Sequence, residues 1–508
     1  MPHHDVITCV GGLNPVAVQH LRDQIAEQLV LAKRQVAPEF PQHQSEMAVD
    51  SQRILIPVGA DHDPVDHLLT VTYPETTALV VRTSGSTGQG KAVALSIDNV
   101  LTSARATHEA LQGPGVWILA LPAHHVAGVQ VLVRSIVSET PLIVAANADE
   151  KATPNAIIAA IEQAQVVAAD SGQNPLPIYM SLVPTQLHRL LDASHPDARR
   201  RVEALRGVSA ILLGGAAASD GLLEQARAQG IDVVTTYGMS ETSGGCVYNG
   251  VPLPGVSVFI EKGTDPAVST VLLSEHDSQG MNRDESQQGS PLSEGSLEGR
   301  ISLSGPMVAL GYVSASDEEQ ANFSGTGAQR TIRTADMGLW DGRTLRILGR
   351  IDDVIVTGGM KVQPQHVETV LDAHPCVVAS CVVGLEHSEW GQEVVALIQM
   401  AKERRSDAQA DHALCASQSG GDGESTDNKH DSDANSDLTP GQASVQGGES
   451  VRCSREDSLR ISLTNYCREH LPAPSRPKRL VFTDQLPTRG IGKIDRKEVL
   501  RRLRTEDH

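Results

Sequence analysis

Residues Thr83-Ser84-Gly85-Ser86-Thr87-Gly88-Gln89-Gly90-Lys91 follow an apolar run, residues 78–81, that predicts a buried strand. The glycines of this loop let the backbone approach a ligand closely, hydroxyl and N–H groups donate hydrogen bonds, and Lys91 adds a positive charge. We therefore expect the loop to hold a polyanion, and a nucleoside triphosphate is the expected ligand. A flexible Gly/Ser hairpin that binds nothing is the alternative.

The same loop half fits a second pattern. Residues 85–91 match the first seven positions of the P-loop, G-x-x-x-x-G-K, which would indicate a kinase or ATPase. The eighth position fails, because Ala92 replaces the Ser or Thr whose hydroxyl binds magnesium. Residues 92–95 are also apolar and strand-like, whereas a P-loop leads into a helix. A P-loop kinase or ATPase stays open as an alternative.

The composition excludes several classes of partner. The chain has 508 residues, enough for two or more domains, and a formal net charge of -20. Phosphate groups repel such an acidic surface, so nucleic acid and anionic membranes are not expected partners. Aromatic residues make up 3% of the chain, too few for stacking platforms on single-stranded nucleic acid. A small molecule is the expected partner.

Cysteine usage and the N-terminus bear on localisation. The seven cysteines stand at unrelated spacings without the pattern of a zinc site, so we expect reduced thiols. The N-terminus lacks the basic and apolar regions of a signal peptide. No apolar run approaches the roughly 18–20 residues that a membrane span needs. We expect a cytoplasmic protein without membrane insertion.

From about residue 116 to residue 236 the chain alternates between apolar strands and helix-length segments. Strands are predicted at residues 116–121, 142–145, 178–183, 209–213 and 233–236. Such alternation predicts a parallel sheet covered by helices on both faces, with ligands beyond the carboxyl ends of the strands. Short strands after residue 300 then suggest a smaller β-rich subdomain.

The C-terminal part predicts a compact α+β unit. It ends on a second glycine-rich loop that presents a lysine, Gly490-Ile491-Gly492-Lys493. Two lysine loops on different domains suggest a site assembled by domain closure. The fold class is therefore α/β, with a large N-terminal domain (1–351) and a small mobile C-terminal domain (352–508). Polar, Gly- and Ser-rich stretches near 277–299 and 403–455 are expected to be mobile inserts without chemistry.

Three predicted strand ends carry glycines or titratable groups, at residues 121–128, 213–217 and 236–242. A lone histidine is more often structural than functional, and we assign His124 a structural role. Glu241 lies between hydroxyl residues after a strand. It either binds magnesium or is an acid at the start of a helix, and both interpretations stay open.

Eight motifs occur in the order typical of the adenylate-forming superfamily, which contains acyl-CoA synthetases, peptide-synthetase adenylation domains and luciferases. The chain resembles this superfamily from about residue 79 to residue 499, outside the two inserts. The motifs are residues 83–91, 122–128, 214–216, 237–242, Asp336, 349–350, 358–361 and 492–493. The chain departs from the family at Gly90-Lys91-Ala92, where Pro-Lys-Gly is usual.

The resemblance implies a two-step reaction that uses ATP, Mg²⁺ and coenzyme A. A carboxylate attacks the α-phosphate of ATP, and the thiol of coenzyme A then displaces AMP. The resemblance implies that Ser84, Ser86, Thr87 and Lys91 hold the β- and γ-phosphates, and that Ser240 contacts the α-phosphate. It further places Tyr237 at the adenine, Asp336 at the ribose with support from Arg350, and Mg²⁺ on Glu241. The full ATP-binding set is Thr83, Ser84, Gly85, Ser86, Thr87, Gly88, Lys91, Gly214, Gly215, Ala216, Tyr237, Gly238, Ser240, Asp336 and Arg350.

Catalysis and coenzyme A binding are implied in the same way. Lys493 is the residue that would neutralise charge between the carboxylate and the α-phosphate, and His125 matches a histidine near the carboxylate pocket. Asp352 matches the hinge about which the C-terminal domain rotates between the two steps. That rotation would bring Gly358 and Gly359 to the coenzyme A channel.

The resemblance also bears on the substrate. Residues 236–248 look like the pocket of o-succinylbenzoate–CoA ligases of menaquinone biosynthesis, especially actinobacterial ones, which implies o-succinylbenzoate as the acid. Arg134 is the candidate anchor for its second carboxylate, and a surface or ion-paired arginine is the alternative. Gly244 and Gly245 either keep the acyl pocket open or form a plain turn.

Several alternatives stay open. The acid could be another aromatic or fatty acid, and the protein could be a nucleotide-binding scaffold without catalysis. A peptide-synthetase domain would need a carrier domain, and a luciferase would need oxygen chemistry of which the sequence shows no sign. The oligomeric state is also open, with a homodimer as one alternative.

Overall fold

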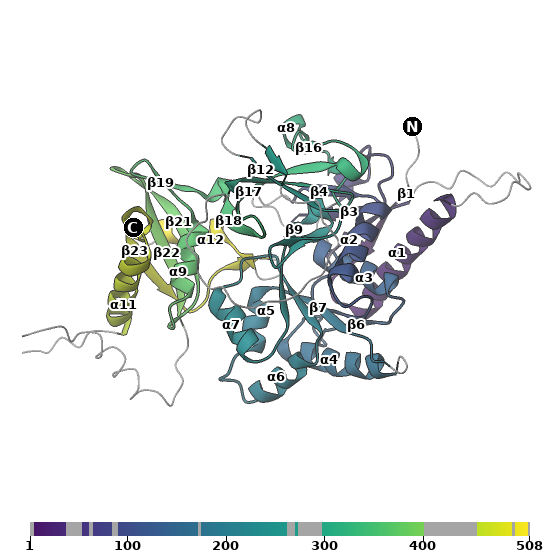
Figure 1. Cartoon of the computed structure of the whole chain (residues 1–508), viewed down its shortest axis with the longest axis horizontal. Helices are drawn as coiled ribbons and strands as arrows, with labels where there is room; N and C mark the ends of the chain where they lie inside the picture. Colours follow the sequence, from purple (N-terminus) through teal and green to yellow (C-terminus); the bar gives the residue numbers. More distant parts are fainter. Residues whose placement is uncertain are drawn as a thin grey trace, which may run out of the picture.

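The structure is a computed structural model, and it describes residues 5–36, 53–59, 65–83, 90–170, 174–261, 270–272, 297–400, 455–489 and 493–505 (Figure 1). Residues 84–89 of the predicted polyanion loop and residues 490–492 of the second lysine loop lie outside this set. Most of the two predicted inserts lies outside it as well. No described helix combines the length and the apolar character needed to cross a bilayer.

The strand ahead of the polyanion loop belongs to a five-stranded sheet. Its members, in spatial order, are β1 (Asp5–Val10), β2 (Arg53–Val58), β3 (Leu79–Arg82), β4 (Ala92–Leu95) and β15 (Gly311–Val313). α1 (Pro15–Val36) packs against β1 and β2. β3 and β4 pair antiparallel, with Arg82 opposite Ala92. The loop therefore connects two strands of a hairpin, and the alternative of a P-loop that leads into a helix is wrong.

The predicted parallel sheet is confirmed, with two antiparallel strands added at one edge. Its seven strands are, in spatial order, β11 (Val251–Pro252), β10 (Gly244–Tyr248), β9 (Val233–Met239), β8 (Ala210–Leu213), β7 (Ile178–Leu182), β5 (Val116–Leu119) and β6 (Leu142–Val144). The strands from β9 to β6 run parallel. β10 turns back antiparallel on β9, because left-handed backbone at Ser243 and Gly244 reverses the chain there.

Helices cover both faces of this sheet, because the strands alternate their side chains between two cores. Trp117 and Leu119 belong to the core beneath α2 (Ile97–Ala110) and α3 (Val126–Val137). Val116 and Ile118 belong to the opposite core, beneath α4 (Pro154–Ala169), α5 (Pro184–Leu190), α6 (Ala198–Arg206) and α7 (Asp220–Ala228). The predicted cap Ser96 accepts a hydrogen bond from Asn99 N–H at 3.1 Å.

The β-rich subdomain forms a third sheet. Its strands are β12 (Ser257–Glu261), β13 (Thr270–Leu272), β14 (Leu297–Ser304), β16 (Phe323–Ser324), β17 (Thr331–Trp340) and β18 (Leu345–Arg350), with α8 (Asp317–Gln320) beside them. The predicted end of the first insert is wrong, because β14 begins at Leu297, which pairs with Trp340 of β17. The polar composition that precedes Leu297 concealed the start of this strand.

The C-terminal unit has its own sheet and cores (Figure 1, green to yellow). Its strands are β19 (Ile355–Thr357), β20 (Met360–Val362), β21 (Val377–His387), β22 (Gly391–Met400) and β23 (Arg479–Thr483), packed with α9 (Pro364–Asp372), α11 (Arg455–His470) and α12 (Arg496–Thr505). α11 begins at Arg455, the last residue of the second predicted insert. The predicted domain boundary falls within the one-turn 3-10 helix η4 (Ile351–Asp353), and the division into two domains stays a prediction.

Candidate active site

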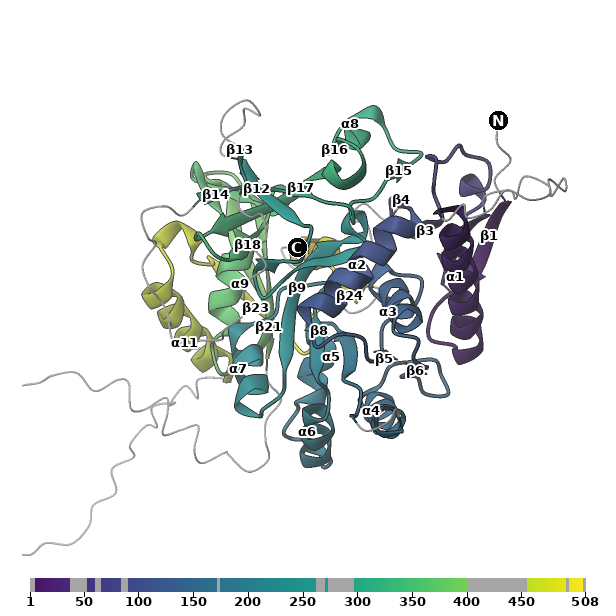
Figure 2. The same cartoon turned by 45° about the vertical axis from the view of Figure 1, so that its right-hand side comes forward.

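Lys493 of the C-terminal unit lies beside the glycine turn that follows β8. Strands β24 (Thr488–Arg489) and β25 (Lys493–Ile494) form a short hairpin, with Arg489 opposite Lys493. A Cβ atom placed on Gly215 would lie 3.6 Å from Lys493 Cε. Figure 2 shows the yellow strand β24 close to β8 and β9. The structure thus brings the C-terminal lysine to the turn formed by Gly214, Gly215 and Ala216.

Burial and neighbouring cations act together on Lys493. Desolvation lowers its pKa from the ordinary lysine value, and Arg489 and Arg350 lower it further, while Glu241 opposes them. Glu241 is therefore close enough to interact with the lysine electrostatically. Lys493 is a half-buried cation near two other cations, so binding of an anionic ligand beside it would stabilise its charged form.

The residues predicted to bind the nucleoside contact one another. The Tyr237 hydroxyl, on β9, donates a hydrogen bond to Asp336 Oδ2 on β17 at 2.7 Å. Arg350 lies opposite Asp336 on β18, with 3.8 Å between its Nη1 and Asp336 Oδ1. Arg350 Nη2 also pairs with Asp352 Oδ2 at 2.7 Å. The predicted ribose carboxylate, its supporting arginine and the predicted hinge residue therefore form one connected cluster.

The protonation of this pair follows from burial. Desolvation raises the pKa of Tyr237 well above the ordinary tyrosine value, so its hydroxyl remains a donor. Desolvation also raises the pKa of Asp336, although the Tyr237 hydrogen bond and Arg350 both act to lower it. Gly238, next along β9, has no room for a side chain, since a Cβ atom would lie 2.1 Å from Gly244 O.

Glu241 lies in a one-turn 3-10 helix, η2 (Ser240–Thr242), between β9 and β10. Glu241 is thus an acid in the first turn of a short helix, and its role as a magnesium ligand stays a prediction. Its side chain is buried, and Oε1 accepts a hydrogen bond from the Tyr312 hydroxyl at 2.8 Å. Ser240, the predicted α-phosphate contact, is the first residue of the same turn and is also buried.

Tyr312 is a residue of this site that the sequence did not reveal. It lies on β15, which pairs with β4 directly after the polyanion loop. Its ring packs edge-on against Phe323, and Lys91 Nζ lies 4.8 Å above its centre. Tyr312 therefore connects the loop lysine to the Glu241 carboxylate. Only the pairing of β15 with β4 brings these residues together, and no local pattern predicts it.

The described ends of the polyanion loop are fixed by backbone contacts. Ser84, Gly85, Ser86, Thr87 and Gly88 lie outside the described residues. Thr83 N–H donates to Lys91 O at 2.8 Å, and Lys91 N–H donates to Thr83 Oγ1 at 2.9 Å. Lys91 Nζ lies 2.9 Å from Glu319 Oε1 on α8. Both side chains are about 40% exposed, so this ion pair is weak and a phosphate group could replace it.

Substituting Tyr312 with phenylalanine tests whether its hydroxyl positions Glu241. The ring would still pack on Phe323 and beneath Lys91, while the hydrogen bond to the carboxylate is lost. Such a bond to a charged group contributes about 1.5–3 kcal/mol, so we expect acid-dependent pyrophosphate release to fall roughly tenfold or more. The Mg²⁺ concentration for half-maximal rate should rise as well. Tyr466→Phe, on the distant helix α11, is the matched control, and an unchanged rate and Mg²⁺ response in Y312F would leave Tyr312 a packing residue only.

The two histidines after β5 have different surroundings. His124 Nδ1 accepts a hydrogen bond from Gly12 N–H at 3.2 Å, which is consistent with its predicted structural role. His125 is the residue before α3 and packs against the His124 ring, with 4.3 Å between ring centres. Its role near the substrate carboxylate stays a prediction.

The glycines predicted to bind coenzyme A lie elsewhere in the described structure. Gly358 and Gly359 form the turn between β19 and β20, with φ angles of 54° and 78°. No described heavy atom lies within 4 Å of a Cβ atom placed on either residue. The turn therefore faces open space in this conformation and does not contact the nucleotide cluster.

The alternative for Arg134 is wrong, and the alternative for Gly244 and Gly245 stays open. The two glycines begin strand β10, opposite Met239 and Gly238 of β9, directly after left-handed backbone at Ser243 and Gly244 reverses the chain. Arg134 is neither a surface residue nor ion-paired, because its side chain is 3% exposed and no acidic residue of the described chain forms an ion pair with it. Its role as an anchor stays a prediction that depends on its surroundings.

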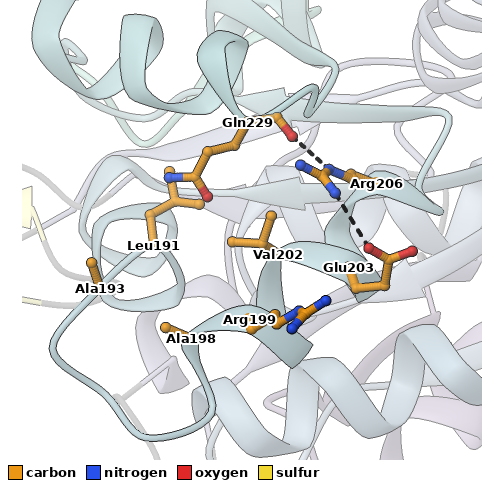
Figure 3. Close-up of a pocket in the computed structure, with 8 residues that line it drawn as sticks. All are labelled: Leu191, Ala193, Ala198, Arg199, Val202, Glu203, Arg206 and Gln229. Carbon is orange, nitrogen blue, oxygen red and sulfur yellow. Dashed lines mark hydrogen bonds and ion pairs between the residues drawn. The ribbon is translucent and has the colours of Figure 1, made fainter.

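A pocket of about 350 Å³ between α5, α6 and the end of α7 contains none of these residues (Figure 3). Arg206 on its wall is already held, with Nε donating to Gln229 O at 2.7 Å and Nη1 lying 3.3 Å from Glu203 Oε2. The described residues also contain no cluster of three or more His, Cys, Asp or Glu side chains that could hold a metal ion. A metal at the site would therefore depend on ligand oxygens in addition to Glu241.

Known proteins are similar to this chain in sequence. A probable 2-succinylbenzoate–CoA ligase of Mycobacterium tuberculosis is 32% identical over 464 residues, which cover 90% of this chain and 93% of that protein. A 2-succinylbenzoate–CoA ligase of Bacillus subtilis is 28% identical over 63% of this chain and 58% of its own length.

Solved structures show the same fold. ATP-bound MatB from Rhodopseudomonas palustris has a TM-score of 0.62 and 20% identity, covering all of this chain and 97% of that one. The o-succinylbenzoate CoA synthetase MenE of Bacillus subtilis, in complex with the acyl-adenylate OSB-AMP, has a TM-score of 0.58 and 20% identity, covering 98% and 88%. The family model described as AMP-binding enzyme matches residues 13–313. The chain belongs to the family of AMP-binding enzymes.

Proposed function

We propose that this protein is an ATP-dependent acid–CoA ligase. It adenylates o-succinylbenzoate with release of pyrophosphate and then transfers the acyl group to coenzyme A with release of AMP. The observation that carries the proposal is the position of Lys493 beside Gly215 and within electrostatic reach of Glu241. The names of the M. tuberculosis and B. subtilis relatives support o-succinylbenzoate as the acid.

The nucleoside would be held by the cluster of β9, β17 and β18. Asp336 would accept hydrogen bonds from the ribose hydroxyls. Arg350, whose guanidinium lies 3.8 Å from the carboxylate, would stabilise the ionised form of Asp336. Adenine would lie between Tyr237 and the turn of Gly214, Gly215 and Ala216. The loop from Thr83 to Lys91 would close on the β- and γ-phosphates, with Lys91 exchanging Glu319 for a phosphate oxygen.

Glu241 fits the chemistry of a magnesium site. Mg²⁺ in nucleotide enzymes is commonly held by one or two carboxylates together with phosphate oxygens and water. The single buried carboxylate of Glu241, oriented by Tyr312, matches that arrangement. A bound Mg²⁺ would supply charge stabilisation for the phosphate oxygens.

Lys493 would act on the reacting groups themselves. Attack of the carboxylate on the α-phosphate brings two anions together, and charge builds on the oxygens between them. A cation already fixed beside Gly215 stabilises that charge without reorganising at the moment of reaction. Ser240 and His125 would then contact the α-phosphate and the carboxylate pocket.

The second step requires that Lys493 leave, so that the thiol of coenzyme A can approach the acyl carbon. We infer that residues 352–508 move as a unit about Asp352 and bring Gly358 and Gly359 to the thiol channel. The open space on the Cβ side of Gly358 and Gly359 supports the inference that this turn meets a partner in another conformation.

A pyrophosphate-release assay across carboxylic acids tests the proposal. With ATP and Mg²⁺, o-succinylbenzoate should give pyrophosphate and AMP, and coenzyme A should then yield the thioester. Benzoates and fatty acids should react at least tenfold more slowly. Formation of ADP would contradict the ligase, and faster turnover of a fatty acid or another aromatic acid would leave a ligase with a different substrate.

A further inference from the structure

Arg134 lies near the C-terminal end of α3 with its guanidinium buried. Arg134 is 3% exposed, and its Nε has no hydrogen-bond partner among the described residues. Nη2 lies 3.4 Å from the Tyr248 hydroxyl, beyond the usual length of an N–H···O bond. The guanidinium also lies over the Trp117 ring, 5.0 Å from its centre. Buried charges in proteins are normally paired, so these contacts leave most of the donor capacity of Arg134 unused.

The neighbouring histidine does not alter this charge. Burial, and to a smaller extent the charge of Arg134, lower the pKa of His108 to about 4. Trp117 Nε1 donates to His108 Nε2 at 3.3 Å, which requires a lone pair on that nitrogen. His108 is therefore neutral at pH 7, and Arg134 is the cation of this cluster.

A row of adjacent residues leads from the active-site lysine to Arg134. It begins at Gly215, beside Lys493, and continues through Gly214, where a Cβ atom would lie 2.3 Å from Thr236 Oγ1. Thr236 lies opposite Tyr248 in the β9–β10 pair. The row starts at the turn after β8 and continues onto the β9–β10 pair.

Gly245 completes the row. A Cβ atom placed on it would lie 3.3 Å from Thr236 Cβ and 3.0 Å from Tyr248 Cε1. Tyr248 then contacts Arg134 through its hydroxyl, which also lies 3.0 Å from Thr107 Oγ1. An acid whose reacting carboxylate meets Lys493 would lie along this row of residues, with its far end toward the guanidinium.

We propose that Arg134 binds a second carboxylate of the substrate, at the end opposite the carboxylate that is adenylated. The enzyme would thereby select aromatic dicarboxylic acids over monocarboxylic acids of the same shape. The incoming carboxylate takes the Nε donor and replaces the long contact of Nη2 with the Tyr248 hydroxyl. The inference rests on the proposed ligase activity and adds the group that recognises the acid.

The test compares two acids that differ only in the second carboxylate, o-succinylbenzoate and 3-benzoylpropionate. Pyrophosphate release is measured for the unmodified enzyme, for Arg134→Met and for Arg105→Met, an exposed arginine on the neighbouring helix α2. We expect the unmodified enzyme and R105M to prefer o-succinylbenzoate by about a hundredfold or more in kcat/KM. R134M should lose that preference while its kcat/KM for 3-benzoylpropionate stays within about threefold of the unmodified enzyme.

Each other outcome has a defined meaning. An equal loss for both acids in R134M, or no preference in the unmodified enzyme, overturns the inference and leaves the ligase intact. Turnover of a monocarboxylic acid alone also overturns it. Should R134M fail to fold, Arg134→Lys keeps a buried cation of shorter reach and should retain only part of the preference; full retention contradicts the proposal.

Binding separates this inference from the ligase activity. Melting temperature is measured with AMP and either acid, and o-succinylbenzoate should raise it more than 3-benzoylpropionate does, a difference that R134M abolishes. Preferential binding without pyrophosphate release from any acid would contradict the proposed function and support Arg134 as the anion site. Pyrophosphate release without preferential binding of o-succinylbenzoate would support the proposed function and contradict Arg134 as the anion site.

Discussion

Replacing Lys493 with alanine is expected to slow the adenylation step by about a thousandfold or more while leaving the second step nearly unchanged. The reason is that Lys493 lies against the Gly215 turn as a cation already fixed among Glu241, Arg350 and Arg489. Removing one preorganised donor of developing charge typically slows a reaction by about 10²–10³-fold, and a full charge contributes more. If the C-terminal unit rotates before thioester formation, the lysine is absent from the second reaction.

Two assays separate the steps. Pyrophosphate release with saturating ATP reports adenylation, and transfer to coenzyme A from synthetic acyl-adenylate reports the second step. Lys497→Ala, one turn further along and exposed on α12, is the matched control. A similar loss in both assays would contradict the rotation of residues 352–508.

The pH dependence follows from the same residue. Burial, Arg489 and Arg350 lower the pKa of Lys493, so its charge is lost at a lower pH than that of an ordinary lysine. Because only the charged form of Lys493 stabilises the transition state, adenylation should be retained below that pKa and fall as the pH rises through it. An alkaline limb in the profile of kcat/KM that lies below the ordinary lysine range, and that disappears in K493A, is the expected result.

The sequence predicted the elements whose patterns are local. Residues 116–121 and 178–183 are short apolar runs between helix-length segments, and both became central strands. Ser96 carries its own capping signal and begins α2 as expected. The antiparallel strand β10 was not predicted, because the reversal depends on left-handed backbone at Ser243 and Gly244 rather than on a hydrophobic pattern.

The site was predictable in its motifs and not in its contacts. Glu241 and Asp336 stand in recognisable segments, but their partners Tyr312 and Tyr237 reach them through strand pairings far apart in sequence. The surroundings of Arg134 could not be predicted from the sequence either. Its helix reads as apolar in sequence, and only the packing of α3 on β5 and β10 reveals a guanidinium without a carboxylate.

Glu241→Gln is expected to lower the rate of adenylation by about a hundredfold, because it removes the one charge that would fix Mg²⁺ in the described site. Glutamine has nearly the same shape, and its Oε1 can still accept the Tyr312 hydrogen bond, so the fold should be preserved. The substitution should mainly weaken Mg²⁺ binding, so that the Mg²⁺ concentration for half-maximal rate rises strongly. Since Glu241 is only 8% exposed, water cannot easily take the place of its carboxylate.

Two measurements decide the result for E241Q. Titrating Mg²⁺ at fixed ATP gives the shift in metal requirement, and calorimetry with ATP in the presence or absence of Mg²⁺ gives the metal-dependent part of nucleotide affinity. Glu318→Gln, an exposed acid on α8, removes the same charge outside the site and should behave as the unmodified enzyme. A large fall in rate with an unchanged Mg²⁺ requirement would mean that Glu241 acts on Lys493 rather than on the metal, because the two groups interact electrostatically. Combining E241Q with Y312F distinguishes these roles further: if Tyr312 acts only by holding the carboxylate for Mg²⁺, the double variant should lose no more than E241Q alone.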